Sequence, residues 1–173
     1  MPIEPPQSGQ PPPMDIENDL EQLARQERDL CFARFDLATA WDLGTRIRTV
    51  CEQRGVAVAI EVRLARETVF FCAMPGTGPE NADWARRKRN TVELLQRSSY
   101  LVGRSLAKEG TSLEQKMGLP LRDYASHGGS VPIRTKGSGC IGAVTVSGLP
   151  QREDHLLVCD VLSQMCRDSH AVD

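Results

Sequence analysis

The chain has 173 residues, 40% hydrophobic and 25% charged, an ordinary balance for one folded domain with a proper core. Its 21 basic and 23 acidic residues give a formal net charge of −2, which argues against a nucleic-acid-binding protein. No apolar run approaches the ~20 residues of a membrane span. We therefore expect neither nucleic acid nor membrane among its partners.

The N-terminus and the cysteines favour a cytoplasmic protein. Residues 1–14 are rich in proline, lack the basic and apolar parts of a signal peptide, and predict a disordered tail. The six cysteines form no Cys-x-x-Cys pair, and several fall in apolar-patterned segments, as expected for reduced structural thiols. We predict a single domain over residues 15–168, followed by a frayed C-terminus at 169–173.

Two helices are predicted at the start of this domain. Residues 15–29 are a charged helical segment with a thin apolar stripe. Asp36 is a good N-cap for the next helix, and Gly55 is a good C-terminal stop. The second helix carries one apolar side, which we expect to be buried and which consists of Leu37, Ala40, Trp41, Gly44, Ile47 and Cys51.

A β-hairpin is predicted next. Residues 56–64 alternate between large apolar side chains and small or charged ones, which is the period of a strand with one buried face. The short polar link 65–67 leads to a second strand at 68–74.

The middle of the chain is predicted to be helical. Residues 74–81 have the composition of a loop, and a helix follows from about Asp83 to Gly110. Because this helix is long, we expect a bend near Ser98 and Ser99. Residues 112–126 predict a short helix and a turn.

A second hairpin and a last helix complete the pattern. Strands at 131–135 and 140–146 flank a Gly/Ser turn, and Pro150 opens the helix, where its missing N–H costs nothing. The order of elements predicts an α/β (α+β) domain with an antiparallel sheet of four to five strands. Two hairpins build this sheet, and helices flank it.

Two sequence motifs do not carry the chemistry that their residues suggest. The glycines of Gly137-Ser-Gly139-Cys-Ile-Gly142 match a dinucleotide fingerprint, but they enter a strand instead of opening a helix. Ser147 lies at a strand-to-helix junction, but Thr145 occupies the place where a nucleophile elbow needs glycine. We therefore predict neither a nucleotide site nor a catalytic serine.

His127 is the most informative histidine. It precedes Gly128 and Gly129 in a loop before a strand, where a ligand or another backbone can approach closely. Its role stays open between a metal or haem-iron ligand, a hydrogen-bonding loop anchor and a surface residue. No His/Cys/Asp/Glu group has the spacing of a closed metal site, so none is predicted.

Four consecutive basic residues, Arg86-Arg87-Lys88-Arg89, follow Trp84 at a helix start. They span a full helical turn and cannot all face one ligand. One interpretation is a solvated face. The other is that Arg87 or Lys88 holds a carboxylate or phosphate in a cleft.

Several segments together resemble one family. The two strongest are Tyr124-Ala-x-His127-Gly128-Gly129 and Thr145-Val-Ser-Gly148-Leu-x-Gln151-x-Glu153-Asp154-His155. Shorter matches lie around Phe35, Val58 and Asn81. Together, residues 20–168 resemble the heme-degrading (HbpS/GlcG-like) superfamily and a subgroup of uncharacterised proteins within it. The resemblance implies a profilin-like fold, homo-oligomers, and haem or a related tetrapyrrole as candidate ligand.

Carried over position by position, the resemblance marks candidate ligand-binding residues without assigning them chemistry. They are Trp84, Arg87, Lys88, His127, Gly128, Gly129, Glu153, Asp154 and His155. Our hypothesis is an oligomeric binding module whose cleft takes a planar or acidic small molecule. The alternatives are an oligomeric adaptor that binds other proteins, and an enzyme that uses His127 or His155 as acid and base.

Overall fold

Four antiparallel strands form the centre of the fold, in the order β2-β1-β4-β3. The computed structural model describes residues 13–171, and the predicted tail lies almost wholly outside them. The hairpins β1–β2 and β3–β4 are those predicted, the first from the alternation and the second from the Gly/Ser turn, and β1 joins them by pairing with β4. The predicted fold class is thereby confirmed. The strands are β1 (Ala59–Leu64), β2 (Glu67–Ala73), β3 (Ser130–Thr135) and β4 (Gly139–Ser147).

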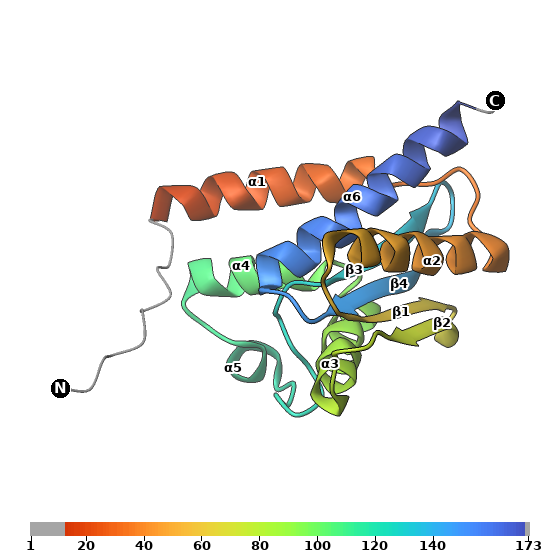
Figure 1. The fold of residues 1–173 in the computed structure, drawn as a ribbon. Helices are drawn as coiled ribbons and strands as arrows, with labels where there is room; N and C mark the ends of the chain where they lie inside the picture. The colour runs from red at the N-terminus through yellow and green to blue at the C-terminus, as the bar shows by residue number, and fades with distance from the viewer. Residues whose placement is uncertain (1–12, 172–173) are drawn as a thin grey trace.

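Helices cover both faces of the sheet (Figure 1). The helices α2 (Leu37–Arg54) and α6 (Gln151–His170) lie on one face, and α3 (Pro79–Leu95) lies on the other. Helix α1 (Pro13–Asp29) packs along α4 (Ser99–Glu109). The short α5 (Leu113–Met117) leads into the loop that carries His127. No helix within residues 13–171 is long and apolar enough to cross a membrane.

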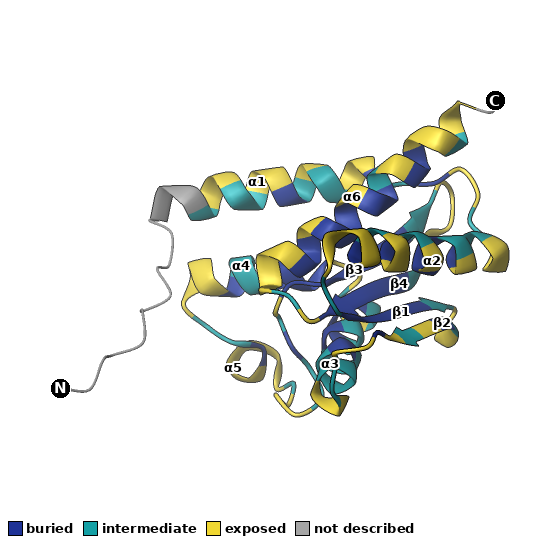
Figure 2. Cartoon of the chain, viewed as in Figure 1, coloured by how far each residue is buried: buried dark blue, intermediate teal, exposed yellow. Residues whose placement is uncertain are grey.

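The main core lies between the sheet and the pair α2 and α6. Val58, Ile60 and Val62 point into it, as the alternation predicts. The opposite face of β1 is also covered, because Glu61 forms an ion pair with Arg89 of α3 at 3.0 Å. Figure 2 shows the central strands buried, whereas parts of β2 are exposed. Helix α3 therefore packs over a partly polar layer.

The single long helix predicted from residue 83 to 110 is wrong. Helix α3 begins at Pro79 and ends at Leu95, where Gln96 takes a left-handed conformation with φ 55°. Ser98 then caps α4 as a new helix. The chain therefore turns at Gln96 instead of bending within one helix, which directs α4 toward α1.

Trp41 lies at the rim of the sheet and not in the core, which corrects the predicted buried side of α2. Its side chain is 59% exposed and contacts Phe70 edge-on, with ring centroids 5.1 Å apart. Phe70 leans against Gly44, where an added Cβ would lie 2.3 Å from the ring. Because Phe70 fills the space beside α2, Trp41 and Leu37 remain exposed.

All six cysteines are free thiols, in agreement with the predicted structural role. Cys51, Cys159 and Cys166 are buried, and burial raises the pKa of Cys51 to about 11. Helix α6 continues to His170, so the predicted frayed C-terminus does not begin at residue 169, and Pro150 is the N-cap of this helix and not its first residue.

Candidate functional site

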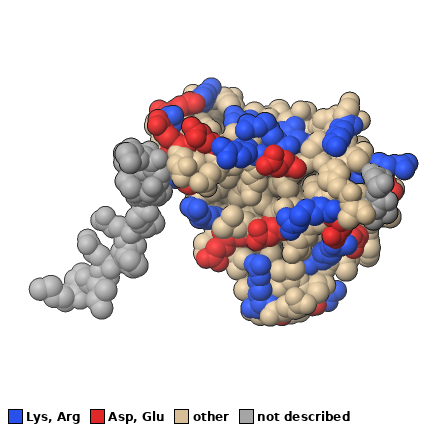
Figure 3. All heavy atoms as spheres, turned by 90° about the horizontal axis from the view of Figure 1, so that it is seen from above, with Lys and Arg blue, Asp and Glu red and all other residues tan. Residues whose placement is uncertain are grey.

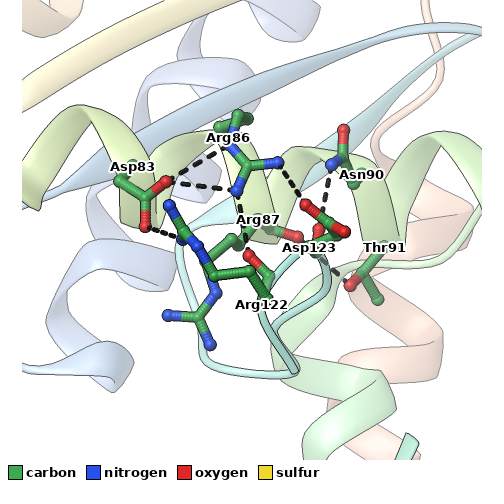
Figure 4. A network of polar contacts seen from close by, with 7 residues as sticks. All are labelled: Asp83, Arg86, Arg87, Asn90, Thr91, Arg122 and Asp123. Carbon is green, nitrogen blue, oxygen red and sulfur yellow. Dashed lines mark hydrogen bonds and ion pairs between the residues drawn. The ribbon is translucent and has the colours of Figure 1, made fainter. Parts of the chain in front are cut away.

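A polar network fastens the loop between α5 and β3 to α3 (Figure 4). Arg86 donates to the Asp123 carboxylate at 3.0 Å and to the Arg122 carbonyl at 2.9 Å. Asn90 donates to the Asp123 carbonyl at 2.9 Å, and Arg122 pairs with Asp83 at 2.7 Å. Figure 4 shows these side chains converging from the helix and the loop. The loop is therefore held along the length of α3.

A second set of contacts holds the loop closer to His127. The Thr91 hydroxyl donates to the Ala125 carbonyl at 2.9 Å, and both residues are buried. The Ala125 N–H donates to the Arg87 carbonyl at 3.1 Å. On the other side, a Cβ added to Gly103 of α4 would lie 2.0 Å from the Ser126 carbonyl oxygen. The chain is thus confined from two sides just before His127.

These contacts place His127 beside Trp84. The two ring centroids are 4.9 Å apart with planes at 70°, an edge-to-face contact. The Arg87 guanidinium carbon lies 4.2 Å from the centroid of Trp84, in cation–π distance. Arg87 Nε is buried and has no hydrogen-bond partner within residues 13–171. The three side chains form a rim that is aromatic and cationic.

The pKa of His127 is lowered from its ordinary value. The main cause is desolvation by the protein packed around the ring, although the residue keeps an exposed face. The positive charges of Lys88 and Arg87 act in the same direction. The imidazole is therefore neutral at neutral pH, with an unprotonated nitrogen able to bind a metal or accept a hydrogen bond.

The floor of the site is a buried ion pair between α3 and α6. Lys88 Nζ donates to Asp154 Oδ2 at 2.9 Å and lies 3.3 Å from the Val146 carbonyl oxygen. Asp154 also accepts from the N–H groups of Leu149 at 3.0 Å and Gly148 at 3.4 Å. Burial lowers the pKa of Lys88 and raises that of Asp154, while their mutual attraction opposes both shifts.

Trp84 and His127 of the rim and the Lys88–Asp154 floor line an open hollow of about 270 Å³. Arg87 contacts Trp84 but does not itself line the hollow. Of the residues predicted from the sequence, Trp84, Lys88, His127 and Asp154 line it together. Five further lining residues were not predicted as site residues, namely Asn81, Ser147, Gly148, Leu149 and Gln151. All five lie within the segments that resemble the family, and this resemblance is the signal that could have found them.

Gly128 and Gly129 serve the close approach of backbone segments. A Cβ on Gly128 would lie 2.2 Å from the Gln151 carbonyl oxygen. Gly129 has a φ of +134°, and a Cβ there would lie 2.4 Å from the Val146 carbonyl oxygen. The two glycines therefore seat the His127 loop against β4 and the start of α6.

Five of the predicted residues do not line the hollow: Arg87, Gly128 and Gly129 adjoin its lining residues, whereas Glu153 and His155 lie away from it. Glu153 is exposed and does not line it. His155 is 1% exposed, and its Nε2 lies 2.9 Å from Gln26 Oε1 of α1 and 3.4 Å from Cys159 Sγ of α6. Within residues 13–171, neither His127 nor His155 has a hydrogen-bonded carboxylate, so the acid–base interpretation lacks its orienting group.

The four consecutive basic residues have four different environments. Arg86 belongs to the loop network, Arg87 lies on Trp84, and Lys88 lies in the floor. Arg89 pairs with Glu61 on the sheet. The basic run is therefore not a continuous cationic surface. On the upper side of the molecule, away from α3, basic and acidic side chains are also interspersed (Figure 3).

Comparison with known proteins places this chain in a family. The model of the family described as "Haem degrading protein HbpS-like" matches residues 35–163. The chain belongs to this HbpS-like family. A UPF0303 protein of Azotobacter vinelandii is 53% identical over 155 residues, which cover 90% of the chain and 93% of that relative.

Solved structures share the HbpS-like fold. The crystal structure of the Ybr137w protein has a TM-score of 0.80 and 30% identity, covering 87% of this chain and 89% of that one. The structure of a PduOC–heme complex has a TM-score of 0.59 and 18% identity, covering 72% and 90%. At that identity, the likeness to PduOC shows the fold alone.

Proposed function

We propose that this HbpS-like protein binds a planar, acidic small molecule in the hollow between α3, the His127 loop and the start of α6. Haem or a related tetrapyrrole is the candidate ligand. The observation that carries the proposal is the rim of Arg87, Trp84 and His127, in which Arg87 Nε has no hydrogen-bond partner among the described residues. An aromatic ring offers a stacking surface, and a guanidinium pairs with carboxylates.

The residues present fit haem in charge and in donor type. Arg87, which lies on Trp84 beside the hollow, would hold a carboxylate on the part of the ligand that extends beyond the hollow, and neutral His127 would bind the iron that haem supplies. The Lys88 ammonium already donates to Asp154, so it contributes to the floor and not to ligand charge recognition. The hollow of about 270 Å³ lies just below the range of about 300–1,000 Å³ for small-molecule sites. It therefore encloses only part of a tetrapyrrole.

The comparisons support this choice of ligand without assigning it to the chain. The family description names haem, and a protein of the same fold was solved as a heme complex. The six free thiols support a reducing compartment, and we propose the cytoplasm. We also propose that the protein is a homo-oligomer.

The test is a titration of the purified full-length protein with hemin, followed by the Soret band. We expect saturation at one hemin per chain for the wild type. His127→Ala should weaken binding at least tenfold, because the iron loses its protein ligand. His170→Ala is the matched control, since His170 is an exposed histidine at the far end of α6.

A second variant tests the charge recognition. Arg87→Met keeps part of the side-chain contact with Trp84 but removes the guanidinium, and we expect it to weaken hemin binding several-fold. Binding that does not saturate, or that is the same in wild type, His127→Ala and Arg87→Met, would overturn the proposal. The oligomeric adaptor would then be the better interpretation of the chain.

A further inference from the structure

Two amide side chains line the hollow with their oxygen atoms already engaged. Asn81 Oδ1 accepts the Gly78 N–H at 3.0 Å, where α3 begins. Gln151 Oε1 accepts the Gly128 N–H at 3.1 Å and so holds the His127 loop to the start of α6. Because only the oxygen of an amide accepts a backbone N–H, these two bonds fix the orientation of both amides. Each of the two therefore offers the hollow an NH2 group, which is purely a donor.

The other polar side chains of the hollow add a further donor and a carboxylate that is already compensated. The Ser147 hydroxyl, at the end of β4, can donate, and the residue is only 4% exposed. The buried Asp154 carboxylate accepts from Lys88 and from the N–H groups of Gly148 and Leu149. The acceptors of the hollow are thus engaged within the protein, while donors remain on one side of it. This side, which we name the donor wall, consists of Asn81, Ser147 and Gln151.

The charge around the hollow favours an anion. Lys88 and Arg87 both lower the pKa of His127 through their positive charges. The charge of Lys88 is balanced by Asp154, so the net positive charge beside the hollow comes from Arg87, whose Nε has no hydrogen-bond partner within residues 13–171. An anion that enters the hollow therefore meets both donors and an attractive charge.

The remaining side chains of the hollow suit a flat, apolar body of limited size. Trp84 and His127 contact each other edge to face, and Leu149 adds an aliphatic side chain to the lining. The hollow of about 270 Å³ lies at the lower end of the range for small-molecule sites, so it holds a single ring more readily than a tetrapyrrole. An acid with one ring would fill it.

We propose that the donor wall binds the carboxylate of a small, flat carboxylic acid whose apolar body lies against Trp84. This inference rests on the proposed function, because it specifies how the same hollow takes an acidic ligand. The two oxygens of a carboxylate accept about four hydrogen bonds, and the amides of Asn81 and Gln151 with the Ser147 hydroxyl supply donors for them. When the ligand is a tetrapyrrole, the donor wall receives one of its carboxylates.

The test uses benzoate as the probe and benzamide as the neutral compound of the same shape. Binding is followed by the fluorescence of Trp84 in the full-length protein with Trp41→Phe, because the chain has two tryptophans. We expect benzoate to bind with a Kd of about 1 mM or tighter. Benzamide should bind at least tenfold more weakly, since it lacks the charge and one acceptor oxygen.

Two isosteric variants remove the donors without removing the structural hydrogen bonds. Gln151→Glu and Asn81→Asp keep an oxygen for the N–H groups of Gly128 and Gly78, but they replace an NH2 group with an anionic oxygen. Each should weaken benzoate binding at least tenfold. Gln164→Glu is the matched control, since Gln164 is an exposed residue of the same helix α6 and gains the same charge.

A gain of binding distinguishes a changed donor wall from a damaged fold. Gln151→Glu should bind benzamidinium, the cationic compound of the same shape, at least fivefold more tightly than the wild type does. A variant that had merely lost its structure would bind neither probe. Absence of this gain, in a Gln151→Glu protein with the far-UV circular dichroism of the wild type, would overturn the assignment of the donor wall.

The hemin titration separates this inference from the proposed function. Saturable hemin binding combined with equal affinity for benzoate and benzamide, or with benzoate affinity unchanged by Asn81→Asp and Gln151→Glu, would overturn the donor wall and leave the tetrapyrrole proposal in place. The expected benzoate pattern in a protein that hemin does not saturate would support the donor wall and overturn the tetrapyrrole as ligand.

Discussion

The Lys88 ammonium donates a 2.9 Å hydrogen bond to the Asp154 carboxylate, and the two residues are only 4% and 0% exposed. The pair joins α3, which covers one face of the sheet, to the start of α6, which covers the other. It also forms the floor of the hollow proposed as the ligand site. This contact therefore links the stability of the domain to the shape of the site.

Removal of one partner of this pair should be costly. Lys88→Met leaves the Asp154 carboxylate buried without its cation, and we expect a loss of about 3–5 kcal/mol in the free energy of unfolding in urea. Lys88→Met with Asp154→Leu should recover part of this loss, but not the hydrogen bonds that Gly148 and Leu149 donate to Asp154. Arg48→Met is the control, because Arg48 and Glu52 form a half-exposed pair, and it should cost about 0.5 kcal/mol or less. Equal losses for Lys88→Met and Arg48→Met would contradict the prediction.

Stability should fall as the pH drops from about 6.5 to about 4, because of His155. Burial lowers the folded-state pKa of His155 to about 4, below its ordinary value of 6.5. In this window the unfolded state binds the proton more readily, so acid favours unfolding by up to about 3 kcal/mol. His127 contributes in the same direction. The urea midpoint of wild type should decrease over this range, and His155→Gln should flatten the decrease. His170→Gln, at an exposed position, should follow the wild type, and a wild-type profile independent of pH would count against this account.

The tip of the first hairpin should be open to stabilisation. Ala65 and Arg66 have φ values of 48° and 67°, a left-handed conformation that side chains with a Cβ disfavour. Arg66→Gly should therefore raise the free energy of unfolding by about 0.5–1 kcal/mol, measured by urea unfolding. The neighbouring Glu67→Gly lies in β2 and should lower it by a similar amount. A loss of stability in Arg66→Gly would show that the contacts of the Arg66 side chain stabilise the fold by more than the left-handed backbone conformation destabilises it.

Thr91 should act on ligand binding through the His127 loop. Thr91→Val keeps the shape of the side chain but removes the hydrogen bond to the buried Ala125 carbonyl, at a cost of about 1–3 kcal/mol in stability. Because this bond fixes the chain just before His127, hemin affinity should fall as well. Thr49→Val is the control. The Thr49 hydroxyl donates to the Thr45 carbonyl on the exposed side of α2, so this variant should change neither stability nor hemin affinity. Unchanged hemin affinity in a destabilised Thr91→Val would restrict Thr91 to a structural role.

The sequence by itself determined the family and most of the elements, but not the break between α3 and α4. Alternation over residues 56–64 identified the first hairpin, and Asp36 and Gly55 marked the ends of α2, where each forms the expected cap. These signals are local, because a cap or a strand period depends on residues only a few positions apart. The motif around His127 likewise pointed to the correct family before the fold was known.

Only the tertiary structure decided where individual side chains point. Adjacent basic residues of α3 separate because Asp154, the partner of Lys88, lies 66 positions away on another helix. Asp154 and His155 are neighbours in one motif, yet Asp154 faces Lys88 of α3 and His155 faces Gln26 of α1. Trp41 is exposed because Phe70 takes the space beside Gly44. Such outcomes depend on which distant elements pack together, and a helical or strand period carries no information about that choice.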